Sequence, residues 1–307
     1  MRILVTGITG AIGAALAPRL LAAGHDVRGM ARDPTRATVA GTHGIHVTRG
    51  DAVSGEGLAE ALDRIEVAYY LIHSMEPNAD DFATRDRLAA EHFRDAARAA
   101  GVRRVVYLGG LVPPDRAASP HLASRLEVER IVHATTPESV ALRASIVISA
   151  ASRSFRFLVR LVERLPVLPL PAWRDHRTRP IDGRDVLCFL QRAGERDAAA
   201  GESLDIAGPD TLTYGEMVER IADAMLVDRP PIHLGFTATG LTSRVAAIVA
   251  GETHELIGPL MAGLEGDLLP RDDRAAALLG VRLHGFDAAV ERALRDWEAS
   301  GERLAAR

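Results

Sequence analysis

The chain opens on a short apolar segment that runs into a glycine-rich turn. Residues 2–6 (RILVT) are rich in β-branched side chains, and they are followed by the run Gly7-Ile8-Thr9-Gly10-Ala11-Ile12-Gly13 and then by a helical pattern over 14–21. A strand, a tight glycine turn and a helix in this order can hold a diphosphate, because backbone N–H groups and the positive end of the helix point at it. We favour this interpretation over a turn without a ligand, since the motif has the context that it requires.

Short apolar runs then alternate with longer amphipathic stretches. This alternation is typical of a parallel sheet with helices on both faces. We therefore predict an α/β fold, with a Rossmann-type doubly wound parallel sheet and a smaller, mostly helical C-terminal region. The predicted strands cover residues 2–6, 26–31, 45–48, 66–72, 103–109 and 139–147. The predicted helices of this part cover residues 12–23, 55–63, 83–99 and 122–133.

The alternating pattern loosens near residue 150. Residues 1–150 are expected to form the dinucleotide-binding domain, and residues 151–307 a smaller substrate region. The segment 178–190 of this second region is expected to return to the core sheet. Further helices are predicted near 155–162, 214–226 and 286–299.

Composition limits the partners of the chain. Its 307 residues are 47% apolar and 25% charged, as in ordinary globular proteins, and the formal net charge of −4 gives no general attraction to nucleic acid or anionic membranes. No apolar run reaches the ~18 residues of a membrane span, and the N-terminus enters a strand at once, so we expect a cytoplasmic protein without a signal peptide. The single cysteine, Cys188, excludes an internal disulfide and a cysteine-clustered metal site, and no metal is expected.

The end of the second predicted strand indicates which dinucleotide is bound. NAD sites usually place a carboxylate there for the ribose 2′-hydroxyl, whereas this chain has Ala31 followed by Arg32. A guanidinium can bind a 2′-phosphate through two donors, and Arg36 can assist. We therefore predict NADP(H) in preference to NAD(H), with a solvated arginine as the alternative. Asp51, after the third strand, is expected to contact the adenine amino group or simply to cap its own loop.

Several segments resemble the extended and atypical short-chain dehydrogenase/reductases. They include residues 7–13, 50–51, 104–108, 142–145, 179–186 and 208–214. More narrowly, residues 68–75 (AYYLIHSM), 107–111 (YLGGL) and 121–129 (HLASRLEVE) resemble a bacterial subgroup labelled NmrA-like or nucleoside-diphosphate-sugar epimerase-like. The resemblance covers roughly residues 1–225 and implies an NAD(P)-binding Rossmann fold.

Catalytic members of this superfamily use a Ser, a Tyr and a Lys four residues after the Tyr. In them the tyrosine transfers the proton, and the lysine lowers the tyrosine pKa and holds the nicotinamide ribose. This chain contains no lysine, because all 37 of its Lys and Arg residues are arginine. In register with the family pattern, His121 replaces the Tyr, Arg125 replaces the Lys, and Gly109 and Gly110 stand where the Ser is expected.

Two interpretations of this replacement remain open. In the first, His121 is the general acid and Arg125 anchors the ribose or diphosphate without releasing its proton. In the second, His121 is a helix-start histidine, Arg125 pairs with a neighbouring glutamate, and proton transfer has been lost. His73 and Ser74 are further catalytic candidates, because they follow the fourth strand at the edge where ligands bind to open α/β sheets.

Three functions compete on this basis. The first is an NADP(H)-dependent oxidoreductase that reduces an activated carbonyl or C=C compound, with a small hydrophobic substrate held partly by the apolar segment 236–263. The second is a non-catalytic NADP(H)-binding redox sensor or interaction protein. A sugar-nucleotide epimerase fits worst, because that chemistry relies on the Tyr–Lys pair. No helix-turn-helix or basic stripe indicates nucleic-acid binding, and a homodimer is left open.

Overall fold

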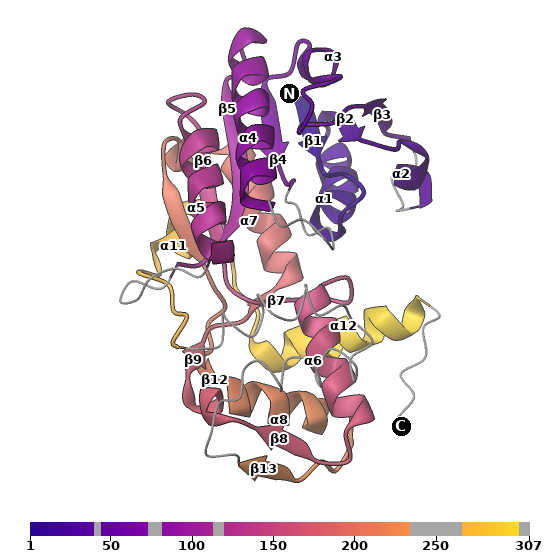
Figure 1. Ribbon diagram of the computed structural model, residues 1–307, viewed down its shortest axis with the longest axis vertical. Coiled ribbons are helices and arrows are strands. Elements are labelled where there is room, and N and C mark those ends of the chain that lie inside the picture. The colour runs from indigo at the N-terminus through magenta and orange to yellow at the C-terminus, as the bar shows by residue number, and fades with distance from the viewer. Residues whose placement is uncertain (40–43, 73–81, 113–119, 234–265, 301–307) are drawn as a thin grey trace.

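A parallel sheet forms the centre of the computed structural model, which describes residues 1–39, 44–72, 82–112, 120–233 and 266–300. Its strands are β1 (Arg2–Thr6), β2 (Asp26–Ala31), β3 (His46–Arg49), β4 (Val67–Tyr70), β5 (Arg104–Gly110), β6 (Val140–Ala144) and β11 (Ser203–Ile206). The seven strands lie in the order β11-β6-β5-β4-β1-β2-β3, and every neighbouring pair is parallel (Figure 1). The predicted Rossmann-type sheet is therefore confirmed.

Helices cover both faces of this sheet. One face packs against α1 (Ala11–Ala22), α7 (Gly183–Glu195) and α11 (Arg274–Leu279), and the other against α3 (Leu58–Leu62), α4 (Phe82–Ala99) and α5 (Pro120–His133). Alternate strand residues point to opposite faces. Ile3 and Val5 accordingly belong to the first core cluster and Leu4 to the second. Burial on both faces explains why the strands read as nearly continuous apolar runs. The short helix α2 (Thr35–Val39) follows β2.

The order of the strands reverses between β1 and β4. At this point the buried hydroxyl of Thr6 donates to the carbonyl oxygen of Tyr69 at 2.9 Å and accepts from the N–H of Leu71 at 3.1 Å. The side chain therefore fixes the ends of the two strands relative to one another. In open α/β sheets, the crevice outside such a switch point is where ligands bind.

A second, smaller core lies beyond the carboxyl ends of these strands (Figure 1). It is built mainly from α6 (Arg153–Arg164), α8 (Tyr214–Ala224) and α12 (Phe286–Ala299). Three separate two-stranded sheets accompany these helices: β7 (Val147–Ile148) pairs with β10 (Ile181–Asp182), β9 (Arg177–Thr178) with β12 (Leu212–Thr213), and β8 (Leu168–Leu170) with β13 (Pro231–His233). The 3-10 turns are Ala172–Asp175 and Asp197–Ala199.

The seventh strand, β11, was not predicted from the sequence. Its residues Ser203-Leu204-Asp205-Ile206 include polar side chains at alternate positions, which do not read as a buried strand. The predicted strand 139–147 also proves to be two strands, β6 and β7, of which only β6 belongs to the main sheet. The apolar segment 236–263 lies outside the described residues.

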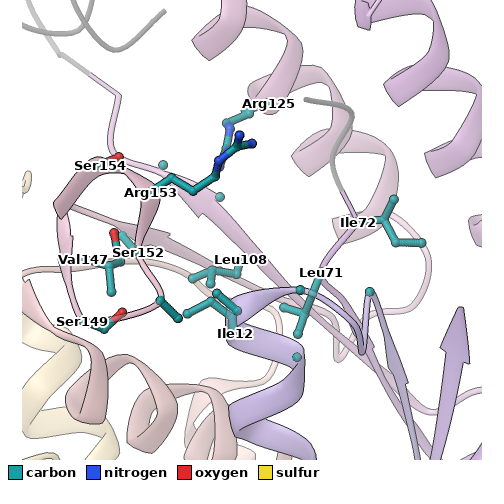
Figure 2. A pocket seen from close by; sticks show the side chains of 18 of the residues that line it. Ile12, Leu71, Ile72, Leu108, Arg125, Val147, Ser149, Ser152, Arg153 and Ser154 are labelled. Atoms are coloured by element: carbon teal, nitrogen blue, oxygen red, sulfur yellow. The ribbon is translucent and has the colours of Figure 1, made fainter. Parts of the chain in front are cut away.

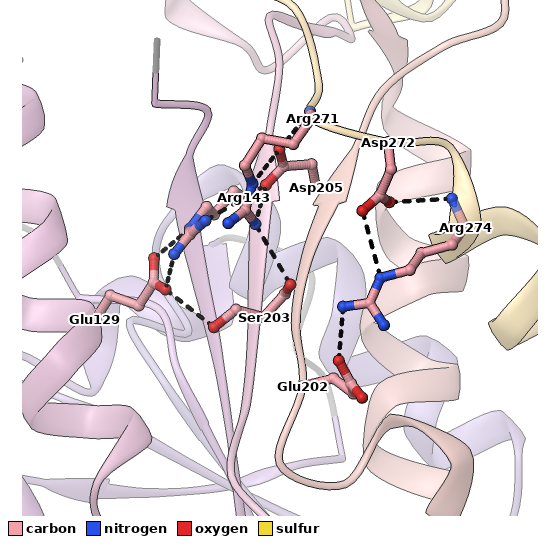
Figure 3. Close-up of polar contacts among 8 residues, drawn as sticks. All are labelled: Glu129, Arg143, Glu202, Ser203, Asp205, Arg271, Asp272 and Arg274. Atoms are coloured by element: carbon pink, nitrogen blue, oxygen red, sulfur yellow. Dashed lines mark hydrogen bonds and ion pairs between the residues drawn. The ribbon is translucent and has the colours of Figure 1, made fainter. Parts of the chain in front are cut away.

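The polar face of β11 takes part in an ionic network (Figure 3). Asp205 accepts hydrogen bonds from the backbone N–H and the guanidinium of Arg271, at 2.8 to 2.9 Å, and lies 3.7 Å from Arg143. Arg143 in turn donates two hydrogen bonds to Glu129 on α5, which raise the pKa of its guanidinium. Ser203 also donates to Glu129, at 3.1 Å. The network therefore ties α5 to the sheet one helical turn after Arg125.

No helix in the described part of the chain combines the length and the apolar character that a membrane span needs.

Candidate functional site

A cavity of about 750 Å³ opens at the carboxyl edge of the sheet. This volume lies in the upper part of the roughly 300–1,000 Å³ that is usual for ligand pockets. Residues that follow β1 to β6 form one wall, and residues of α6 and α8 form the other (Figure 2). The cavity therefore joins the two cores of the molecule.

The glycine turn after β1 lines this cavity in a conformation that side chains would not permit. Gly7 has a φ of +63°, and a Cβ atom there would lie 2.9 Å from the carbonyl oxygen of Leu71. At Gly13 a Cβ atom would lie 2.4 Å from the carbonyl oxygen of Gly7, so α1 can approach β1 only because this residue is glycine. Gly10 donates to the carbonyl oxygen of Gly7 at 2.9 Å and precedes the first residue of α1.

The start of α1 has the geometry that a diphosphate needs. Ala11, Ile12 and Gly13 form its first turn, whose N–H groups have no partners within the helix. These residues line the cavity together with Gly7, Thr9 and Gly10. The turn therefore fits a dinucleotide. Its backbone packs closely against neighbouring backbone atoms on one side and faces the cavity on the other.

The other end of the cavity contains Arg32, which is predicted to distinguish NADP(H) from NAD(H). Arg32 is exposed and lines the cavity directly after the buried Ala31, and Arg36 lines it from α2. The nearby carboxylate of Asp33 accepts from the N–H and the hydroxyl of Thr35, and these hydrogen bonds lower its pKa. Asp33 therefore caps α2, which leaves arginine side chains on the cavity wall at this point.

Asp51 also lines the cavity at this end. Its Oδ1 atom accepts from the N–H of Val53 at 2.8 Å, and its carbonyl oxygen accepts from the N–H of Gly55. The loop-capping role is thus present in the structure, and the position on the cavity wall keeps a contact with adenine as a prediction.

The predicted nicotinamide end is formed by the end of β5 and the start of α5. Gly109, Gly110 and Arg125 line the cavity here. His121 lies in the first turn of α5, one helical turn before Arg125, but its side chain is outside the described part of the structure. His73 and Ser74 are also outside the described residues. All nine cofactor-binding candidates thus lie on one cavity, whereas of the four catalytic candidates only Arg125 has a described side chain.

The tyrosines do not restore the arrangement of the superfamily. Burial raises the pKa of Tyr69, Tyr70 and Tyr107, and Tyr107 donates its hydroxyl to the carbonyl oxygen of Arg125 at 3.2 Å. These three are buried core residues and do not line the cavity. Tyr214, the remaining one of the chain's four tyrosines, lines the cavity from the start of α8.

Several lining residues were missed from the sequence. They come from the loop after β7 and from α4, α6 and α8, and they include Arg85, Ser149, Ser152, Arg153, Ser154, Phe157, Leu158 and Met217. The serine-rich run 145–154, directly after a strand of the sheet, was a signal that could have pointed to some of them. The described residues contain no group of three or more His, Cys, Asp or Glu side chains placed to hold a metal ion.

Comparisons with known proteins agree with this geometry. Residues 7–146 match the model of the NAD(P)H-binding family. They include the glycine turn and five strands of the main sheet, β2 to β6. The N-terminal part of the chain therefore resembles NAD(P)H-binding domains, in agreement with the sequence analysis, and this supports a nicotinamide dinucleotide as the cofactor.

Two curated relatives are reductases of Streptomyces. The (4-alkanoyl-5-oxo-2,5-dihydrofuran-3-yl)methyl phosphate reductase of Streptomyces griseus is 29% identical over 253 residues, which are 81% of this chain and 80% of that protein. The 3-diazoavenalumate denitrifying reductase of a Streptomyces species is 39% identical over 115 residues, which are 34% of this chain and 36% of that protein.

Solved structures share the fold over nearly the whole chain. The UDP-glucose 4-epimerase of Thermotoga maritima, with UDP-glucose, is 14% identical with a TM-score of 0.76, and the match covers 98% of this chain and all of that one. A short-chain dehydrogenase/reductase superfamily protein of Agrobacterium tumefaciens, with bound NAD, is 18% identical with a TM-score of 0.70, and the match covers 98% and 99% of the two chains. At these identities the likeness concerns the fold.

Proposed function

We propose that this protein is an NADP(H)-dependent reductase of a small molecule with an activated carbonyl or C=C group, acting without a Tyr–Lys pair. The observation that carries the proposal is the single cavity that joins the glycine turn to an apolar compartment. That compartment is lined by Leu111, Leu122, Phe157, Leu158 and Met217. A dinucleotide at the turn would therefore have room for an apolar substrate beside it. Both Streptomyces relatives are named as reductases, which supports the same reaction class.

Different residues of the cavity bind different parts of the dinucleotide. The turn from Gly7 to Gly13 holds the diphosphate, Arg32 binds the 2′-phosphate, and Arg125 holds the nicotinamide ribose or the diphosphate. A bound nicotinamide supplies the hydride, so the protein has to bind, orient and protonate the substrate. Arg125 stays charged throughout, since a guanidinium does not release its proton in proteins.

His121 is our candidate for the proton donor. It stands one helical turn before Arg125 on α5, in register with the catalytic tyrosine of the superfamily. Imidazole is suited to this role because it ordinarily titrates close to neutrality. Tyr214, which lines the cavity from α8, is the alternative donor.

The proposed function is tested by incubating the protein with NADPH and a panel of enones, quinones, unsaturated lactones and ketones. We expect oxidation of NADPH with at least one class and a reduced product that mass spectrometry can identify. The absence of turnover across the panel, with tight NADP⁺ binding retained, would contradict a reductase and favour a cofactor-dependent sensor.

Replacement of Arg32 by alanine is expected to raise the KM for NADPH by about 10- to 100-fold and to leave the KM for NADH nearly unchanged. The reason is that a charge-assisted contact to a phosphate contributes roughly 1.5–3 kcal/mol, and NADH has no 2′-phosphate. Arg19→Ala is the control, because it removes the same charge from an exposed position on α1 that does not line the cavity. Equal weakening of both cofactors would contradict the assignment.

Replacement of His121 by alanine is expected to lower kcat by about 100-fold or more, since a positioned general acid contributes roughly 10²–10⁴. Steady-state rates with NADPH saturating measure this effect. If turnover is unchanged, His121 is not the donor, and Tyr214→Phe becomes the variant to measure.

A further inference from the structure

We propose that Tyr107 is a positioning residue for the nicotinamide end of the cofactor site. Its buried hydroxyl donates to the backbone carbonyl oxygen of Arg125 and so determines where α5 presents the Arg125 side chain to the cavity. The proposal rests on the proposed function in one respect, since it takes Arg125 as the contact to the nicotinamide ribose or the diphosphate. Tyr107 acts without touching the cofactor, because it does not line the cavity.

The first observation is the hydrogen bond between the strand and the helix. The hydroxyl of Tyr107, on β5, lies 3.2 Å from the carbonyl oxygen of Arg125, on α5. Arg125 lies inside the helix, where each carbonyl oxygen already accepts from the N–H four residues later. A carbonyl oxygen has two lone pairs, so it can also accept from Tyr107. This bond is not needed to complete α5, and its effect is therefore to place the helix relative to the strand.

The second observation is the packing of the Tyr107 ring. The residue is 3% exposed, and its ring lies beside the ring of Tyr70 on the neighbouring strand, with centroids 6.2 Å apart. Tyr70 in turn packs edge-on against Phe93 of α4, with centroids 4.9 Å apart. Burial raises the pKa of Tyr107, so its hydroxyl stays protonated well above neutral pH and remains a donor. The position of this hydroxyl is thus fixed by the sheet and by α4.

The third observation is the close approach of Gly109 to the same ring. Residues 107 and 109 point to the same face of the sheet, because they are two positions apart on β5. A Cβ atom at Gly109 would lie 2.8 Å from Cε1 of Tyr107 and 3.3 Å from its hydroxyl oxygen. Gly109 lines the cavity, so the phenol lies behind this part of the cavity wall. The tyrosine ring thus fills the space of a side chain at 109, which accounts for glycine at one of the positions where a serine is expected.

A second contact holds α5 one turn after Arg125. Glu129 accepts two hydrogen bonds from Arg143 of β6, at 2.8 and 2.6 Å, and neither residue lines the cavity. Tyr107 fixes the turn from which Arg125 extends to the cavity (Figure 2), and the ionic network fixes the next one. Without the hydroxyl of Tyr107, the turn of Arg125 can shift while the rest of the helix stays in place. The loss should therefore affect cofactor binding more than folding.

The test compares two Tyr→Phe variants, each of which loses one buried hydroxyl and keeps the ring. Tyr69→Phe is the matched control for Tyr107→Phe, because the hydroxyl of Tyr69 also donates to a helix carbonyl oxygen at 3.2 Å, that of Leu190 on α7, and Tyr69 does not line the cavity. Fluorescence titration measures NADPH binding, and thermal unfolding measures stability. We expect both variants to unfold at a similarly lowered temperature. Tyr107→Phe should weaken NADPH binding by about three- to tenfold, and Tyr69→Phe should leave it unchanged.

A double variant tests whether the effect passes through Arg125. Arg125→Ala should itself weaken NADPH binding, and Tyr107→Phe should cause no further loss in that background, since residues that act through one contact are not additive. Wild-type affinity in Tyr107→Phe would overturn the proposal. An equal loss of affinity in Tyr69→Phe, or additive losses in the double variant, would overturn it as well.

Failure of the proposed function gives a different set of results. The titrations need NADPH and no substrate, so an absence of turnover on the panel would overturn the reductase and leave the role of Tyr107 standing. Turnover with unchanged NADPH binding in Tyr107→Phe would overturn the positioning role alone. Normal NADPH binding in Arg125→Ala would overturn both the role of Arg125 in the cofactor site and the role of Tyr107.

Discussion

Replacement of Gly13 by alanine is expected to weaken NADPH binding by about tenfold or more and to lower the free energy of unfolding by roughly 1–3 kcal/mol. The added methyl group would lie 2.4 Å from the carbonyl oxygen of Gly7 and 2.9 Å from the Cα atom of Ile8. These are backbone atoms that no side-chain rotation can move. The start of α1 must therefore shift away from β1, and its N–H groups move with it.

The expected decrease in the free energy of unfolding separates this prediction from an effect of helix propensity. Gly13 lies within a helix, where alanine alone would stabilise by about 1 kcal/mol relative to glycine. A loss of stability can thus be attributed to the close approach and not to helix propensity. Fluorescence titration with NADPH and thermal unfolding measure the two effects, with Ala15→Ser, an exposed change on the same helix, as the control. A more stable variant with normal NADPH affinity would contradict the role assigned to this glycine.

Replacement of Asp205 by alanine is expected to lower the free energy of unfolding by about 3 kcal/mol, because it removes a buried carboxylate that accepts three hydrogen bonds from Arg271. The carboxylate of Asp205 is 2% exposed and faces both Arg143 and Arg271. Arg143 is itself only 13% exposed and loses a carboxylate at 3.7 Å, but it keeps its two hydrogen bonds to Glu129. Arg271, at 44% exposure, can be solvated, which holds the expected loss at the lower end of the range for buried pairs.

A neighbouring ion pair provides the control for this prediction. Arg274 and Glu202 lie in the same region (Figure 3), but their side chains are 49% and 36% exposed. Because exposed pairs contribute roughly 0–1 kcal/mol, Arg274→Ala should change the stability little. Chemical denaturation of both variants separates the two cases. Equal losses would show that burial of the carboxylate does not determine the contribution of the network.

The sequence predicted the parts of the fold whose pattern is local. β1, β2 and α12 have the predicted bounds, because an apolar run between turn residues, or a clear helical period, suffices to define them. β11 escaped prediction because its polar residues are explained only by Glu129 and Arg271, which are far away in the chain. Its place in the sheet follows from contacts that no local pattern contains.

The candidate site divides in the same way. The residues from Gly7 to Gly13, together with Arg32 and Asp51, could be proposed because each directly follows a strand, and strand ends of a parallel sheet meet at one edge. Arg153 and Tyr214 could not be proposed, since they reach the cavity from α6 and α8 of the smaller core. The position of those helices relative to the sheet depends on tertiary packing, which one sequence does not display.

The two walls of the cavity differ in how readily substitutions can alter the binding preferences of the protein. One wall consists of strand ends whose backbone is fixed by the sheet, and the other of side chains on α6 and α8. Substitutions on the two helices can therefore alter which molecule is accepted while the dinucleotide remains in place. Cofactor preference and substrate preference are accordingly separate traits in this architecture, open to independent selection or to independent redesign.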